Sequence, residues 1–328
     1  MKVKVENLNH CSICIRECKI GNSFCHRRDE VGNLIQPNRF NAIVVDNLFD
    51  KPIAHFGENS RILSVGSWAC NLRCLGCQNV NLSWAIKGCC LGFKELDPDQ
   101  LAEFAIENNC KGICFTYNEP AILLEAIEDY SNAAKDKGLF TVFVTNSTLT
   151  EKSTRRLAKC IDVVAADIKS MNDDFYYEYC GAAGIDHVAD KILNCIRTFS
   201  ESGTHVEVRT NIIPGGNDQA ENYYQIASWI KNYMGVDRPW HITRYFPANQ
   251  LSHIQSTSIT EMEKAKRIGI ETGLKYVYTY SEKGCDCAKD SHLFNSGINE
   301  TGNAGTSCCN QEKAKLNFTD ITFSMNRN

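Results

Sequence analysis

The sequence predicts an α/β protein whose main part is an incomplete, open (β/α) barrel. From about residue 60 to 280, apolar β-rich runs alternate with helical patterns. Such repetition implies a parallel sheet with right-handed crossovers. The run contains six or seven strand–helix units, which is too few for a standard eight-unit barrel. A doubly wound open sheet is the alternative to the open barrel.

The expected strands are short apolar runs, and the helices between them have recognisable ends. Asp97 and Pro98 place a cap residue before a first-turn proline. Gly138 follows a helical pattern as a C-terminal glycine. We expect strands at residues 61–66, 112–117, 139–145, 163–168, 205–212, 240–245 and 275–280. We expect helices at residues 98–109, 119–137, 152–160, 188–202, 220–233 and 260–272.

Three parts are expected along the 328 residues, which are enough to bury a full core. Residues 1–58 form a cysteine-rich N-terminal segment, and residues 59–280 form the barrel. Residues 281–328 form a loop-rich, cysteine-containing C-terminal tail with much Gly, Asn, Ser and Thr.

Composition and charge narrow the class of protein. A hydrophobic content of 43% and a charged content of 23% are ordinary for a soluble globular protein. The formal net charge of −4 and the lack of a long basic run do not indicate nucleic-acid binding. We expect neither a signal peptide nor a membrane span. Eighteen cysteines without a secretory signal predict thiols kept reduced in the cytoplasm.

The most informative motif is a group of three cysteines, which we call the triad: Cys70, Cys74 and Cys77. Three thiolates at this spacing can hold three irons of a [4Fe–4S] cluster and leave the fourth iron without a protein ligand. An open coordination position serves to bind a substrate or cofactor. A zinc knuckle or three unrelated cysteines are the alternatives. Because an apolar run at residues 62–66 precedes the triad, the cluster should lie at the carboxyl end of a strand.

Polar residues follow several of the other expected strands, and these strand ends should meet at one edge of the sheet. They are Asn118, Glu119, Asn146, Lys169, Arg209, His241 and Arg244. Carboxylate and amide oxygens can accept hydrogen bonds from an α-ammonium group, and a lysine can neutralise a carboxylate. The alternative roles are a helix cap for Asn118 and Glu119, a solvated lysine, and a structural histidine.

Further cysteines form two candidate metal sites outside the triad. Cys11, Cys14, Cys18 and Cys25 can supply four thiolates, with His26 in reserve, and either zinc or a second iron–sulfur cluster would fit. Unliganded thiols are the alternative. The tail offers a weaker candidate, in which adjacent cysteines rarely bind one metal well: Cys285, Cys287, Cys308 and Cys309.

Taken as an ordered set, the motifs resemble the radical S-adenosylmethionine (SAM) superfamily. The resemblance covers roughly residues 10–280 and is to its glycyl-radical-activating-enzyme-like branch, closest to the AmmeMemoRadiSam-type proteins. The motifs are Cys70-x3-Cys74-x2-Cys77-Gln-Asn, Thr116-Tyr-Asn-Glu-Pro120, Val144-Thr-Asn146, Asp167-Ile-Lys169, Ile213-Pro-Gly and Trp240-His-x-x-Arg244.

The resemblance implies a partial (β/α)6 TIM-like barrel in which SAM chelates the open iron of a [4Fe–4S] cluster. By position, Asn118 and Glu119 would lie near the SAM amino group and Lys169 near its carboxylate. Asn146 and His241 would contact the ribose or nearby groups. Val144 departs from the pattern, because activating enzymes of pyruvate formate-lyase type carry an acidic residue there. The tail also differs from the ending expected for the group.

The implied function is that of a radical SAM enzyme, an oxidoreductase of activating-enzyme type. It would cleave SAM reductively to a 5′-deoxyadenosyl radical and abstract hydrogen from a protein or peptide, by glycyl-radical activation or side-chain modification. The alternatives are radical chemistry on a small metabolite, and a non-catalytic iron–sulfur or zinc protein that acts as carrier or scaffold. The expected electron donor is a flavodoxin or ferredoxin-type protein.

Overall fold

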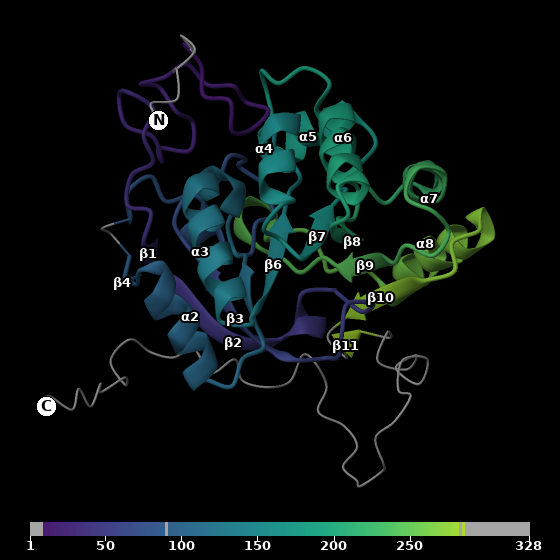
Figure 1. Cartoon of the computed structure of the whole chain (residues 1–328). Coiled ribbons are helices and arrows are strands. Elements are labelled where there is room, and N and C mark those ends of the chain that lie inside the picture. Colours follow the sequence, from purple (N-terminus) through teal and green to yellow (C-terminus); the bar gives the residue numbers. More distant parts are fainter. Residues whose placement is uncertain (1–8, 89–90, 282–283, 286–328) are drawn as a thin grey trace, which may run out of the picture.

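Seven parallel strands follow one another across the sheet in the order of the chain (Figure 1). The computed structural model describes residues 9–88, 91–281 and 284–285. A doubly wound sheet would reverse its strand order at a switch point, so the sequential order confirms the barrel type. The strands are β3 (Arg61–Gly66), β5 (Gly112–Phe115), β6 (Phe140–Thr145), β7 (Val163–Asp167), β8 (His205–Ile212), β9 (Trp240–Arg244) and β10 (Val277–Ser281).

Antiparallel strands border the parallel ones, and the described sheet does not close into a full barrel. β2 (Ala42–Asn47) pairs with β3, and β11 (Gly284–Cys285) pairs with β10. A separate small ladder joins β1 (Arg39–Phe40) to β4 (Lys94–Glu95). β2 was not expected, and it extends the sheet into the segment that the sequence analysis placed before residue 59.

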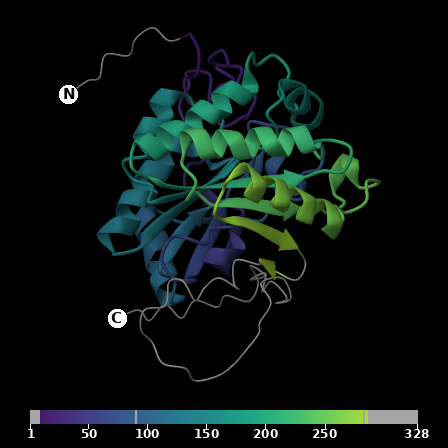
Figure 2. The ribbon, with the colours of Figure 1, turned by 90° about the vertical axis from the view of Figure 1, so that its right-hand side faces the viewer.

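Helices line one side of the curved sheet (Figures 1 and 2). The Asp97 side chain accepts a hydrogen bond from Gln100 N at 2.9 Å, which confirms the expected helix start at Pro98. No helix among the described residues is long and apolar enough to cross a membrane. The main helices are α2 (Pro98–Glu107), α3 (Leu124–Asp136), α4 (Glu151–Leu157), α5 (Asp173–Cys180), α6 (Val188–Glu201), α7 (Ala220–Tyr233) and α8 (Ile259–Thr272). Of these, α5 was not expected.

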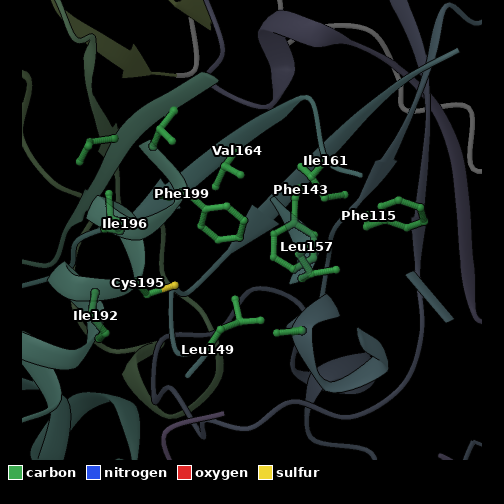
Figure 3. Packing of buried hydrophobic residues seen from close by; sticks show 14 of the residues in the cluster. Phe115, Phe143, Leu149, Leu157, Ile161, Val164, Ile192, Cys195, Ile196 and Phe199 are labelled. Atoms are coloured by element: carbon green, nitrogen blue, oxygen red, sulfur yellow. The ribbon is translucent and has the colours of Figure 1, made fainter. Parts of the chain in front are cut away.

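Alternating side chains of each strand contribute to two apolar layers. Phe143 of β6 points toward the helices, where its ring centroid lies 6.2 Å from that of Phe199 in α6 (Figure 3). Val142 and Val144 belong instead to the cluster inside the barrel. Because both faces of β6 are buried, the strand reads as a nearly continuous apolar run.

The chain between β2 and β3 fills the barrel interior at the seam between the first and last strands. Ile53 is fully buried within the interior cluster, and Phe49 packs in a small cluster around Tyr278 of β10. Glu207 of β8 fastens this segment, because its carboxylate accepts hydrogen bonds from Ala54 N at 2.9 Å and His55 N at 2.7 Å. We call residues 48–56 the seam segment.

Candidate functional site

The triad cysteines lie in the loop that follows β3, and the end of α5 holds this loop in place. Arg73 N donates to the carbonyl oxygen of Cys180 at 2.9 Å. Leu75 N donates to the carbonyl oxygen of Tyr179 at 2.8 Å. These hydrogen bonds satisfy backbone N–H groups of the irregular loop, which have no partners within a regular strand or helix. The triad therefore has a defined backbone position.

Gly66 ends β3 at the point where the chain turns into the triad loop. A Cβ atom there would lie 2.7 Å from the carbonyl oxygen of Thr116 and 2.9 Å from the Cβ of Tyr117. Only glycine permits this close backbone approach. The approach brings the start of the triad loop against the end of β5, where Glu119 follows.

A cavity of about 1400 Å³ opens at the carboxyl ends of the strands. The triad lines one part of its wall, and charged side chains from β7 and β8 line another. Four of the five residues that the resemblance assigns to SAM line the cavity: Asn118, Glu119, Asn146 and Lys169. The structure therefore brings these four together with the triad at one edge of the sheet, as the topology predicts.

Glu119 is a buried carboxylate, 2% exposed, at the cavity wall. Its oxygens accept hydrogen bonds from Thr145 Oγ1 at 2.8 Å, from Asn146 N at 2.7 Å and from Ala121 N at 3.0 Å. The last bond shows that Glu119 also caps a short 3-10 helix. Burial, together with the nearby Asp167 carboxylate, raises the pKa of Glu119 to about 7, because desolvation disfavours the charged form.

The cavity-lining amides of Asn118 and Asn146 hold the triad loop. Asn118 Nδ2 donates to the carbonyl oxygen of Ala69 at 2.8 Å. Asn146 Nδ2 donates to Asn71 Oδ1 at 3.0 Å and lies 4.0 Å from Cys70 Sγ. Asn71 is itself buried. Both expected SAM-binding amides therefore position the loop through their side chains.

Lys169 forms a charged group with two partners at the ends of β7 and β8. Its Nζ donates to Asp167 at 2.7 Å, and Arg209 donates to the other oxygen of Asp167 at 2.6 Å. Burial disfavours the ammonium, but the Asp167 carboxylate outweighs this effect and raises the pKa of Lys169. Two cations share one carboxylate here, so the group has a positive charge to offer an anion in the cavity.

His241 does not line the cavity, and the structure does not bring it to the other predicted SAM contacts. It is fully buried, and its Nε2 lies 2.6 Å from Glu207. His205 Nε2 lies 2.9 Å from the other oxygen of the same carboxylate. His241 therefore belongs to the buried network that fastens the seam segment, which is the structural role considered as the alternative.

Cys180, in contrast, lines the cavity, although the sequence suggested only a small buried hydrophobe. It is 2% exposed and hydrogen-bonds with the Cys74 thiol; this contact and burial raise the pKa of Cys74. The other cysteines interpreted as buried hydrophobes do occupy the core: Cys110, Cys114, Cys160 and Cys195. No local sequence signal marks Cys180, because α5 brings it to the triad from far along the chain.

The four N-terminal cysteines lie in a segment that docks beside the triad loop. Ile15 N donates to Thr148 O at 2.9 Å, and Thr150 N donates to Ile13 O at 3.2 Å. Cys14 is buried, whereas the other three are half-buried: Cys11, Cys18 and Cys25. Of the tail candidates, Cys287, Cys308 and Cys309 lie outside the described residues, as does the side chain of Cys285.

The triad loop fits an iron–sulfur cluster by the chemistry of its donors. Three thiols face one cavity, and Arg73 beside them donates to Cys70 O at 2.8 Å. In the described ranges, no three Cys, His, Asp or Glu side chains converge as ligands of a single ion would. Thiolates of a four-iron cluster each bind a different iron, so they need not converge.

A partial barrel with three cysteine thiols on one cavity at the strand ends defines a protein with a candidate iron–sulfur site. A sequence model described as "Radical SAM superfamily" matches residues 67–227. The chain is also 31% identical over 279 residues to "Uncharacterized protein MJ0808" from Methanocaldococcus jannaschii, covering 83% of this chain and 81% of that protein. The chain belongs to the radical SAM superfamily.

Other relatives are named as activating enzymes, which confirms the resemblance to that branch and identifies an enzyme. The chain is 24% identical to the pyruvate formate-lyase-activating enzyme of Streptococcus mutans, covering 65% of this chain and 84% of that protein. It is 29% identical to the "Putative glycyl-radical enzyme activating enzyme MJ1227" of M. jannaschii, covering 50% and 66%. The family implies a [4Fe–4S] cluster and SAM. Proximity to AmmeMemoRadiSam-type proteins stays a prediction.

Two solved structures support the fold. A radical SAM methyltransferase from Sphaerobacter thermophilus superposes with a TM-score of 0.51 at 16% identity, covering 68% of this chain and 67% of that chain. Streptococcus suis SuiB superposes with a TM-score of 0.52 at 15% identity, covering 72% of this chain and 52% of that chain. At these identities the likeness concerns the fold alone, and it agrees with the partial barrel.

Proposed function

We propose that this chain is a radical SAM enzyme that abstracts hydrogen from a protein or peptide, either to form a glycyl radical or to modify another side chain. The main support is the placement of the triad, Glu119 and Lys169 on one cavity. The relatives named as activating enzymes support a macromolecular substrate. The volume of about 1400 Å³ exceeds that of a typical small-molecule site, and leaves room for a peptide segment beside a cofactor.

In this proposal, Cys70, Cys74 and Cys77 hold the cluster, and the charged groups that line the same cavity orient SAM. When bound, the reduced cluster and SAM supply the one-electron chemistry that removes a hydrogen atom from the substrate. The Glu119 carboxylate accepts hydrogen bonds from the N–H groups of the SAM amino group. Lys169 retains donors beyond the one it uses for Asp167, and these are directed to the SAM carboxylate.

The amides of Asn118 and Asn146 act on the triad loop, so they are positioning residues in this proposal. Asn146 joins Glu119 to Asn71 through its backbone N–H and its side chain. A displacement of the Glu119 carboxylate is therefore transmitted to the residue next to Cys70. This arrangement fixes the position of the Glu119 carboxylate, which accepts from the SAM amino group, relative to the triad. A reaction between two bound groups requires such fixed positions.

The first test is production of 5′-deoxyadenosine by the anaerobically reconstituted, dithionite-reduced protein, measured by mass spectrometry. Cys74→Ala should abolish production, whereas Cys110→Ala, which removes a buried thiol outside the cavity, should retain it. No nucleoside from the wild type, together with no SAM-dependent change in its electron paramagnetic resonance spectrum, would contradict the proposal. Such a result would favour the carrier or scaffold alternative.

A second test addresses the substrate class. An extract of cells grown on deuterated medium is divided by ultrafiltration into macromolecules and small molecules, and each fraction is added to the reaction. Deuterium should enter 5′-deoxyadenosine only with the macromolecular fraction. Enrichment confined to the small-molecule fraction would refute a protein or peptide substrate and support the metabolite alternative. A flavodoxin or ferredoxin in place of dithionite tests the expected electron donor.

A further inference from the structure

The four N-terminal cysteines lie in a short segment that contains no helix or strand of its own. Cys11 N donates to Cys18 O at 2.7 Å, and Phe24 N lies 3.5 Å from Cys18 Sγ. The electrostatic neighbours of Cys25 include Cys11 and Cys18, and those of Cys14 include Cys11 and Cys25. The fold therefore brings all four thiols into one neighbourhood, although no regular element contains them.

Two arginines beside this neighbourhood, Arg16 and Arg27, have no carboxylate partner among the described residues, whereas Arg28, a neighbour of Cys11 and Cys25, pairs with Glu125 at 2.7 Å. Arg27 is fully buried, and its guanidinium donates to Ser67 Oγ at 2.8 Å and to backbone carbonyls. Arg16 donates to the carbonyls of Asn71 and Gly181. Within the described ranges, no carboxylate lies at ion-pair distance from Arg16, Arg27 or Arg73.

Such buried cations need a counter-charge, because an unpaired buried charge is costly. Cys25 is an electrostatic neighbour of Arg27, and Cys14 and Cys18 are electrostatic neighbours of Arg16. The Phe24 ring, next to Cys25, lies 3.6 Å from the Arg16 guanidinium carbon. The guanidinium groups of Arg16 and Arg27 therefore place positive charge beside the four cysteines, and no carboxylate of the described residues pairs with either of them.

The same neighbourhood adjoins the triad through two side chains. The Asn71 amide hydrogen-bonds the Cys14 side chain and accepts a contact from Cys70 Sγ at 3.9 Å. Arg73 has both Cys25 and Cys70 among its electrostatic neighbours. The four N-terminal thiols and the triad are therefore adjacent groups that share Asn71 and Arg73 between them.

We propose that Cys11, Cys14, Cys18 and Cys25 hold a metal–thiolate centre distinct from the triad cluster. Four thiolates around a divalent zinc ion or a [4Fe–4S] cluster in its oxidised form carry a net charge of about −2. Arg16 and Arg27 supply two positive charges close to it. As at the triad, no three thiols of the described residues converge on one point as the ligands of a single zinc ion would; the thiolates of a four-iron cluster each bind a different iron and need no such convergence.

The experiment compares metal content in three variants of the full chain after anaerobic loading with iron and sulfide, or with zinc. One variant replaces the triad by serine, a second replaces the four N-terminal cysteines by serine, and a third combines both. The triad variant should retain about four irons or about one zinc per chain. The combined variant should retain none. The iron and zinc arms identify the metal, and either metal supports the centre.

Metal content and the electron paramagnetic resonance spectrum distinguish a failure of this proposal from a failure of the proposed function. The N-terminal variant should keep the SAM-dependent change of its electron paramagnetic resonance spectrum, because the triad is intact. Equal metal content in the triad variant and the combined variant, with both folded by circular dichroism, would overturn the N-terminal centre. That result would leave the triad assignment unaffected.

A measurement on the wild-type chain guards against variants that do not fold. The loaded protein is treated with iodoacetamide under native conditions, and modified cysteines are located by mass spectrometry before and after metal removal. The half-buried Cys11, Cys18 and Cys25 should be protected in the loaded protein and modified once the metal is removed. Equal modification in both states would refute a metal at these thiols.

Discussion

The proposed contact between the Glu119 carboxylate and SAM predicts that SAM binding depends on pH near neutrality. Its pKa of about 7 reflects burial, whereas the ordinary value for an unfolded chain is 4.5. In the proposed site, the SAM amino group interacts with the ionised form, so binding should release a proton below about pH 7. We therefore expect the affinity for SAM to weaken as pH falls through this range.

The size of the effect follows from the ionised fraction. With a pKa of about 7, roughly one tenth of Glu119 is ionised at about pH 6 and roughly nine tenths at about pH 8. The dissociation constant for SAM should therefore rise about tenfold between about pH 8 and about pH 6.

The same raised pKa affects the stability of the ligand-free protein with the opposite trend. A raised carboxyl pKa means that the protonated form is favoured by folding. This stabilisation is complete below the unfolded value of 4.5 and is lost as pH rises through about 7. The loss is on the order of 3 kcal/mol. Bound SAM should offset part of this loss of stability, because its N–H groups donate to the ionised Glu119 carboxylate.

The assay is anaerobic titration calorimetry of SAM into the cluster-loaded protein between about pH 6 and about pH 8. Glu119→Gln should bind SAM weakly at every pH. The Gln side chain carries an NH2 donor in place of one carboxylate oxygen, and this donor would face the Asn146 N–H group, which donates to Glu119 in the wild type. The affinity of this variant should no longer vary with pH. Glu103→Gln alters an exposed carboxylate and serves as the control. A wild-type affinity that is constant over this range would refute the reasoning.

Three further changes test other parts of the structure. Glu207→Gln should lower the free energy of unfolding in urea by about 3–5 kcal/mol, because it disrupts a buried charged network; a change within error would mean that the seam segment is held otherwise. Gly66→Ala should cost about 1–3 kcal/mol and reduce iron content, since its Cβ would meet the Thr116 carbonyl oxygen; unchanged iron would contradict this. Lys169→Met should weaken SAM binding about tenfold or more, and calorimetry that shows equal affinity would exclude Lys169 from the site.

Most of the barrel could be predicted because its signals are local. The parallel strands are apolar runs buried on both faces, and the Asp97 cap marks the start of α2. The edge strand β2 was missed because its antiparallel pairing with β3 depends on a tertiary partner. The helix α5 was also missed, although Asn172 followed by two aspartates is a helix-start signal.

The site residues that directly follow a strand could be predicted from their spacing in the sequence. The role of a residue within a strand could not, because it depends on the neighbouring strand. The triad and the residues directly after β5, β6 and β7 line one cavity. His241 lies within β9, and its role depends on Glu207 of the neighbouring strand. Sequence reasoning could not pair these two residues, because a buried histidine's partner is set by strand register. Cys180 was hidden for a similar reason, since its contact with Cys74 joins distant segments.

The docking of the N-terminal segment sets an order of events during synthesis. Ile13 and Ile15 bond to the backbone of Thr150 and Thr148, and Arg16 bonds to the carbonyl of Gly181. These partners are made long after the residues that need them, because the chain is synthesised from its N-terminus. The four N-terminal cysteines therefore cannot reach their docked position until more than half of the barrel has been synthesised. In the proposed metal–thiolate centre, iron or zinc can therefore reach these cysteines before the rest of the site has been made.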